Sequence, residues 1–153
     1  MKAVVIYESF FGNTEKIART IADGLAATCE VTVLNVKSGA TPDLKGVDLL
    51  VIGCPIIQFK PSVGMGAYLA SLTPEIVKGL HFACFDTRVH APKFLTGEAG
   101  MTIQKQLLGM GAVAIAEPGR FYVREKKGPL DGNEIEHAAR WAKELAAKLA
   151  AIH

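Results

Sequence analysis

The chain has 153 residues, of which half are hydrophobic and 21% are charged. This length and composition predict one globular domain, residues 1–153, with a sizeable buried core, and they argue against a disordered chain. The 17 Lys and Arg residues nearly balance the 15 Asp and Glu residues, which leaves a net charge of +2. Because the basic residues are spread along the chain, we expect no nucleic acid among its partners.

The cysteines and the N-terminal segment indicate a cellular compartment. Cys29, Cys54 and Cys84 are scattered and form no C-x-x-C pair, so neither a disulfide framework nor a zinc site is expected. Free thiols fit a reducing cytosol. The N-terminal segment lacks the long apolar stretch of a signal peptide, and a membrane span would need about 20 apolar residues in a row. We therefore expect a cytoplasmic protein without a membrane span and without a metal.

Strand and helix patterns alternate in the first third of the chain. Residues 3–7 are a short β-branched run, typical of a strand that is covered on both faces. Residues 13–27 have helical spacing, with apolar residues on one side and charged residues on the other. Residues 30–36 alternate as in a strand near a sheet edge, and residues 47–53 predict a central strand.

The alternation continues to the C-terminus. Pro55 and Pro61 argue against regular structure around them, and Ser62 is expected to cap a helix over residues 63–72. The remaining expected elements are a strand at 80–85, a long loop at 86–98, a helix at 99–110, a strand at 112–116 and a helix at 133–151.

This order of elements predicts an α/β fold of three layers, in which helices cover both faces of a doubly wound, five-stranded parallel sheet. Such sheets bind ligands beyond the carboxyl ends of their strands, where the strand order reverses. The loops expected to carry the site are therefore residues 8–14, 54–62 and 86–98.

The first of these loops, residues 9–14 with the sequence SFFGNT, has the features of an anion site. Gly12 allows a tight turn, and the helix expected to begin near Asn13 presents amide groups that lack internal partners. These amides, the helix dipole and the hydroxyls of Ser9 and Thr14 suit a bound monophosphate. The alternative at this point is an ordinary capped helix start with Gly12 as a plain turn.

The same motifs resemble the flavodoxin family. Residues 9–14 resemble its phosphate loop, usually [T/S]-x-[T/S]-G-x-[T/S], and the order of elements matches over essentially the whole chain. Residues 53–55 and 60–62 resemble the family's second flavin loop. Residues 85–88 and 128–131 resemble a subgroup of flavodoxin-domain proteins. The resemblance implies a short-chain flavodoxin-like fold with strand order 2-1-3-4-5 and FMN as the cofactor.

Carried over residue by residue, the resemblance also implies which residues contact FMN. The expected cofactor-binding residues are Ser9, Phe10, Phe11, Gly12, Asn13, Thr14, Cys54, Pro55, Ile56, Ile57, Gln58, Phe59, Asp86, Thr87 and Arg88.

Two positions depart from the family pattern. Ile57 stands where a Tyr beside the flavin is common, and Phe11 replaces a hydroxyl residue of the phosphate loop. We expect Phe59 or Phe11 to cover one face of the flavin ring instead. For Asp86 and Arg88, pairing with each other and contact with the flavin edge both remain open.

The function that follows is an FMN-binding redox protein, either an electron carrier or a small flavin-dependent reductase. The expected partner is a redox protein or a small-molecule electron acceptor, and no catalytic acid or base is assigned. The alternative, motivated by Ile57 and Phe11, is a flavin-free flavodoxin-like module for protein binding or regulation.

One basic cluster, Arg120, Arg124, Lys126 and Lys127, follows the last expected strand. We expect it on an edge connection at the rim, away from the flavin loops. It either protects the sheet edge by its charge or docks an acidic redox partner or a second copy of the chain.

Overall fold

The computed structural model describes residues 1–57, 60–92, 95 and 97–153. Its strands are β1 (Lys2–Tyr7), β2 (Glu30–Asn35), β3 (Leu49–Ile57), β4 (Lys60–Pro61), β5 (His81–Val89), β6 (Val113–Ala114) and β7 (Gly119–Val123). Its helices are α1 (Asn13–Leu25), the 3-10 turn η1 (Val36–Ser38), α2 (Val63–Ala70), α3 (Pro74–Val77), α5 (Ala99–Gly109) and α6 (Glu134–Ile152).

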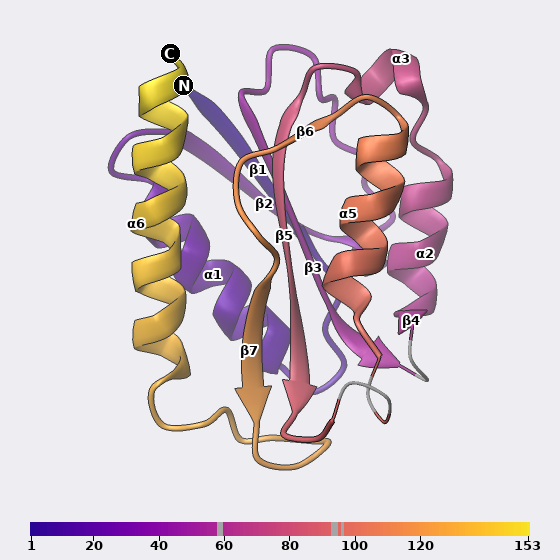
Figure 1. Cartoon of the computed structure of the whole chain (residues 1–153), viewed down its shortest axis with the longest axis vertical. Coiled ribbons are helices and arrows are strands. Elements are labelled where there is room, and N and C mark those ends of the chain that lie inside the picture. Colours follow the sequence, from indigo (N-terminus) through magenta and orange to yellow (C-terminus); the bar gives the residue numbers. More distant parts are fainter. Residues whose placement is uncertain (58–59, 93–94, 96) are drawn as a thin grey trace.

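The sheet has the predicted parallel core. Its strands run in the order β2-β1-β3-β5-β6, which is the expected order 2-1-3-4-5 in sequence terms. Along β1, Val5 lies opposite Val33 of the edge strand β2 on one side and Val51 of the buried strand β3 on the other. The three-layer α/β fold is therefore confirmed (Figure 1).

Two further strands enlarge the sheet within the described residues. The position beyond β5 is shared: β6 pairs with the start of β5, and β7 pairs with its end. Pro118, which has no amide hydrogen, lies in the break between them. The short β4 pairs antiparallel with the end of β3. The expectation of five strands was therefore wrong, because β4 and β7 were not recognised.

The strands also extend further than their sequence patterns predicted. Pro55 lies inside β3 and Pro61 inside β4, so the expectation that these prolines exclude regular structure was wrong. Pro61 pairs with Ile56 at the edge of the sheet, where a missing amide hydrogen is tolerated. Residues 86–89, expected in a loop, are the last residues of β5.

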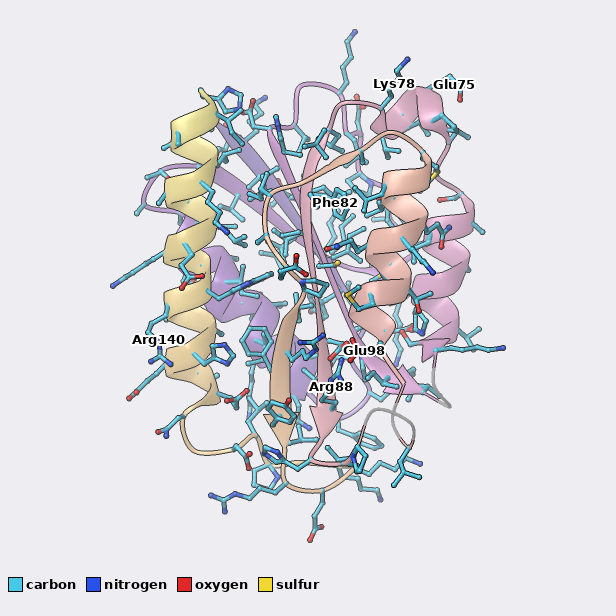
Figure 2. All side chains as sticks on the ribbon, viewed as in Figure 1. Glu75, Lys78, Phe82, Arg88, Glu98 and Arg140 are labelled. Carbon is cyan, nitrogen blue, oxygen red and sulfur yellow. The ribbon has the colours of Figure 1, made fainter. Side chains whose placement is uncertain are left out.

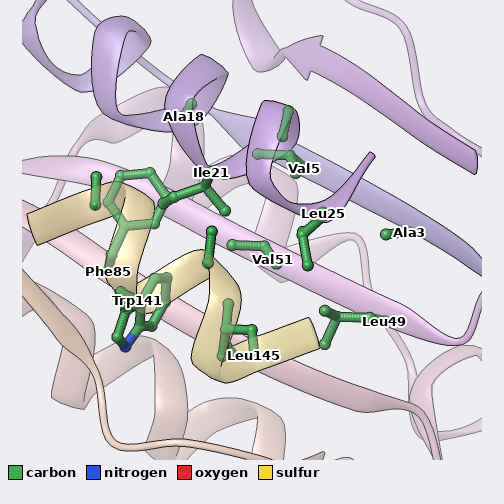
Figure 3. Close-up of a cluster of buried hydrophobic side chains, with 14 of the residues drawn as sticks. Ala3, Val5, Ala18, Ile21, Leu25, Leu49, Val51, Phe85, Trp141 and Leu145 are labelled. Carbon is green, nitrogen blue, oxygen red and sulfur yellow. The ribbon is translucent and has the colours of Figure 1, made fainter. Parts of the chain in front are cut away.

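Each face of the sheet has its own hydrophobic core. α1 and α6 cover one face, where Phe85, Trp141 and Leu145 pack against Val5 and Ile21 (Figure 3). α2 and α5 cover the other face (Figure 1). Because β1, β3, β5 and β7 run parallel, their carboxyl ends meet at one end of the molecule. None of the described helices combines the length and apolarity needed to cross a lipid bilayer.

Candidate functional site

A cavity of about 390 Å³ opens at the carboxyl ends of the strands. All three loops expected to carry the site contribute to it. Ten of the predicted residues line it: Ser9, Phe10, Phe11, Asn13, Thr14, Pro55, Ile56, Ile57, Thr87 and Arg88.

The first loop makes a tight turn into α1. Gly12 has φ of 88° in the left-handed region, and its amide donates to Ser9 Oγ over 3.1 Å. The regular helical bonding starts at the next turn, where the amide of Lys16 donates to the carbonyl of Gly12. Gly12 itself is not among the lining residues, because its role is to turn the chain.

The first turn of α1 presents free amide groups. Within the described part of the chain, the structure shows no acceptor for the backbone amides of Asn13, Thr14 and Glu15. Asn13 and Thr14 also line the cavity. Three consecutive amides at the positive end of a 13-residue helix suit an anion that brings several oxygen atoms.

Two side-chain contacts connect this turn to its neighbours. Thr14 Oγ1 lies 2.7 Å from Thr87 Oγ1, and both hydroxyls are buried. Asn13 Nδ2 donates to the backbone carbonyl of Lys127 over 3.2 Å. The first loop is therefore tied to the end of β5 through Thr87 and to the connection after β7 through Lys127.

The end of β3 supplies an apolar wall. Pro55, Ile56 and Ile57 line the cavity, whereas Cys54 is fully buried behind them. Burial raises the pKa of the Cys54 thiol to about 12, so it stays protonated and unreactive at neutral pH. Gln58 and Phe59, both predicted to bind the cofactor, lie outside the described residues.

At the end of β5, Asp86 and Arg88 pair with each other. Arg88 donates from Nε and Nη2 to the two carboxylate oxygens of Asp86, over 2.8 and 2.6 Å, and both residues are buried. Asp86 also accepts the amide of Gly100 at the start of α5, and Arg88 reaches Glu98 over 3.4 Å (Figure 2). The sequence left open whether these residues pair with each other or contact the flavin edge, and the structure shows the pairing. Arg88 also lines the cavity, whereas Asp86 does not.

Four lining residues were missed by sequence reasoning: Val89, Leu95, Val123 and Lys126. Val89 and Val123 end β5 and β7. The sequence signal for β7 was the alternation of Phe121 and Val123 with Arg120 and Tyr122. Lys126 was expected on a rim away from the loops. That placement was wrong, because the unrecognised β7 carries the chain back to the ends of β3 and β5.

The chain matches known proteins over part of its sequence and over nearly all of its structure. A family model described as a flavodoxin domain matches residues 4–64, and no curated protein sequence matches significantly. Oxidised flavodoxin 1 from Bacillus cereus is 20% identical with a TM-score of 0.80, covering 96% of this chain and 98% of that one. A flavodoxin from the domain Archaea is 23% identical with a TM-score of 0.77, covering 98% and 99%.

The same fold also occurs as part of a larger protein. Rubredoxin oxygen:oxidoreductase from Desulfovibrio gigas is 18% identical with a TM-score of 0.76, and the match covers 98% of this chain but 36% of that one. These likenesses confirm, at the level of the fold, the resemblance that the sequence motifs indicated.

Proposed function

We propose that this flavodoxin-like protein binds FMN in the cavity at the carboxyl ends of its strands and serves in electron transfer. The observation that carries the proposal is the set of three amides, on Asn13, Thr14 and Glu15, without an acceptor within the described residues. They open a helix at the cavity wall, where the phosphate of FMN would accept from them.

The charged side chains that line the cavity also favour an anionic cofactor. The described residues that line the cavity include Arg88 and Lys126 but no Asp or Glu, so a dianionic phosphate meets no repulsion there. The hydroxyls of Ser9 and Thr14 lie on the same wall and supply further donors.

The apolar half of the cavity suits a flavin ring. Pro55, Ile56 and Ile57 from β3 face the same space as Phe11 and Val123. The volume of about 390 Å³ is in the range of small-molecule sites, about 300–1,000 Å³. When bound, FMN supplies the redox chemistry; the protein binds the phosphate, shields the ring from water and sets the polarity around it.

The ionisable groups of the cavity favour an electron carrier over a reductase that donates a proton to its substrate. Among the described lining residues there is no His, Cys, Asp or Glu. Cys54 stands behind the wall with a raised pKa, and the Asp86 carboxylate is engaged by Arg88 and Gly100. A carrier role, rather than a reductase with its own acid or base, is therefore what we propose.

Titration of the purified chain with FMN and with riboflavin tests the proposal. Because riboflavin lacks the phosphate, we expect FMN to bind much more tightly. Thr14→Ala should weaken FMN binding by about 1–2 kcal/mol, the size of a hydrogen bond to a charged group. Thr28→Ala, at the far end of α1, is the matched control and should leave FMN affinity unchanged.

Two results would contradict the proposal. Equal affinities for FMN and riboflavin would refute the phosphate site. A colourless protein that stays colourless with added FMN would favour the flavin-free binding module.

A further inference from the structure

The mouth of the cavity carries two exposed phenylalanines, each with a lysine over its ring. Phe10 is 45% exposed and Phe11 is 48% exposed. Lys37 Nζ lies 4.0 Å from the centre of the Phe10 ring and also donates to the carbonyl of Ser9. Lys127 Nζ lies 6.0 Å from the centre of the Phe11 ring. Exposed aromatic rings are enriched in protein-binding surfaces, and a lysine over a ring face is held there by the ring's electrostatic attraction.

The same mouth holds the excess positive charge of the molecule. Lys126 lines the cavity, and Arg124 lies on the same connection after β7. The acidic residues of this connection are Glu125 and Asp131, and Asp131 is engaged by Arg124 over 3.7 Å. Together with the two lysines beside the rings, Arg124 and Lys126 make four positive charges, and Glu125 and Asp131 make two negative ones. The net charge of this group is therefore +2. That equals the net charge of the whole chain, so the rest of the molecule is neutral overall.

We infer that this mouth, formed by Phe10, Phe11, Lys37, Lys126 and Lys127, docks the acidic face of a partner protein. The inference rests on the proposed function, because a redox partner must approach the cavity mouth to exchange electrons with FMN. The partner's carboxylates pair with the three lysines, while an apolar group at the centre of its face packs on the exposed ring of Phe10. A second copy of the chain docked mouth to mouth would bring like charges together, which disfavours it.

Binding of a labelled decaglutamate peptide to the full chain, measured by fluorescence anisotropy, tests the charge of this surface. The rim variant is Lys126→Glu with Lys127→Glu. The matched control is Lys105→Glu with Lys143→Glu, which changes the net charge equally on the exposed sides of α5 and α6. We expect the rim variant to weaken binding at least tenfold and the control less than twofold. Equal losses in the two variants, or no binding by the unaltered chain, would overturn the inference.

A second arm distinguishes a protein surface from a nucleic-acid surface. Labelled decathymidylate is polyanionic and can stack on aromatic rings, so it competes for the same features. We expect decaglutamate to bind at least as tightly as decathymidylate at equal salt. Clearly tighter binding of the nucleic acid would overturn the assignment of a protein partner.

A kinetic arm uses the chain loaded with FMN and reduced. Ferricyanide accepts one electron per ion and becomes ferrocyanide, and hexaammineruthenium(III) accepts one electron and becomes the ruthenium(II) ion. The Debye length falls from about 10 Å at 0.1 M salt to about 3 Å at 1 M, so added salt screens the positive mouth. We therefore expect added salt to slow electron transfer to the anion ferricyanide and to speed electron transfer to the cation hexaammineruthenium(III). The opposite trend would overturn the inference. If the chain binds no FMN, the proposed function fails, and peptide binding to the bare chain still decides the nature of the surface.

Discussion

At the scale of single residues, the backbone of Gly12 turns the first loop into α1 at the wall of the cavity. Its φ of 88° is unfavourable for a residue with a Cβ, although no atom lies within 4 Å of where that Cβ would be. Gly12→Ala should therefore cost about 1–2 kcal/mol of stability through the backbone alone and should weaken FMN binding. Denaturant unfolding and FMN titration measure the two effects.

Gly39 provides the control for this prediction. It has φ of 74° with equally open space, but it follows η1 and is not a lining residue. Gly39→Ala should cost similar stability and leave FMN affinity intact. If both variants lose FMN equally, the effect of Gly12 is a general loss of folding and not a property of the loop.

The buried pair of Asp86 and Arg88 makes a second prediction at this scale. Arg88→Met leaves the Asp86 carboxylate buried with the amide of Gly100 as its donor among the described residues, and should destabilise the fold by about 3–5 kcal/mol. Adding Asp86→Asn removes the uncompensated charge, so the double variant should be more stable than Arg88→Met alone. Urea unfolding of the single and double variants gives the comparison.

An exposed ion pair is the control here. Arg19 and Glu15 lie one helical turn apart on α1, 3.0 Å from each other. Arg19→Met should change stability far less than Arg88→Met, because water screens this pair. Similar losses at both sites would show that burial of Arg88 is not what makes its pairing important.

At the scale of an element, the start of α2 depends on a carboxylate from another part of the chain. Ser62 occupies the expected cap position, but its hydroxyl is buried and has no partner among the described residues. The helix is capped by Glu8 instead, whose Oε1 accepts the amides of Gly64 and Met65 over 3.1 and 3.3 Å. Glu8 directly precedes the anion loop, so this cap joins the first loop to the second.

Two glycines of α2 test the importance of this cap. A Cβ on Gly64 would lie 2.1 Å from Glu8 Oε2, whereas a Cβ on Gly66 would meet nothing within 4 Å. Gly64→Ala should displace Glu8 and destabilise the fold by about 1–3 kcal/mol. Gly66→Ala should be neutral or stabilise it by up to about 1 kcal/mol through helix propensity. Thermal unfolding of both variants decides, and equal melting temperatures would contradict the role of Glu8.

At the scale of the whole molecule, buried acidic groups predict a loss of stability at alkaline pH. Burial raises the pKa of Cys54 to about 12 and that of Tyr68 to about 12, and it also raises the pKa of Cys84. Above pH 9, the unfolded chain releases thiol protons that the folded chain retains, and above pH 10 the same holds for the phenol of Tyr68. The unfolded state then binds fewer protons, so stability falls as pH rises, by about 1.4 kcal/mol per unit for each such group.

Urea unfolding at pH 8 and at pH 10.5 measures this loss. Tyr68→Phe should reduce the dependence on pH above 10. It should not lower stability at pH 7, because the Tyr68 hydroxyl has no partner among the described residues. An unchanged urea midpoint between the two pH values would contradict the prediction.

Most of the fold was predictable because strong local patterns coincide with the elements. The apolar runs at β1 and β3 and the amphipathic spacing of α1 and α6 placed these elements within a few residues. The first loop was also predictable, since a short segment from Ser9 to Thr14 contains its turn, its helix start and its hydroxyls. The strand β4 was missed because it has two residues, and pairing with β3 rather than local preference makes it a strand. The strand β7 was missed although Phe121 and Val123 alternate with more polar residues.

The sequence by itself determined the order of elements, the α/β class and the turn at residues 9–14, because each depends on residues close together in the chain. Tertiary structure decided the contacts between separate segments: the Glu8 cap on α2, the link from Arg88 to Glu98, and the arrival of Lys126 at the cavity. Propensity cannot reveal these contacts. They depend on how the strands pair and on how the helices pack over the two separate cores, which no local stretch of sequence contains.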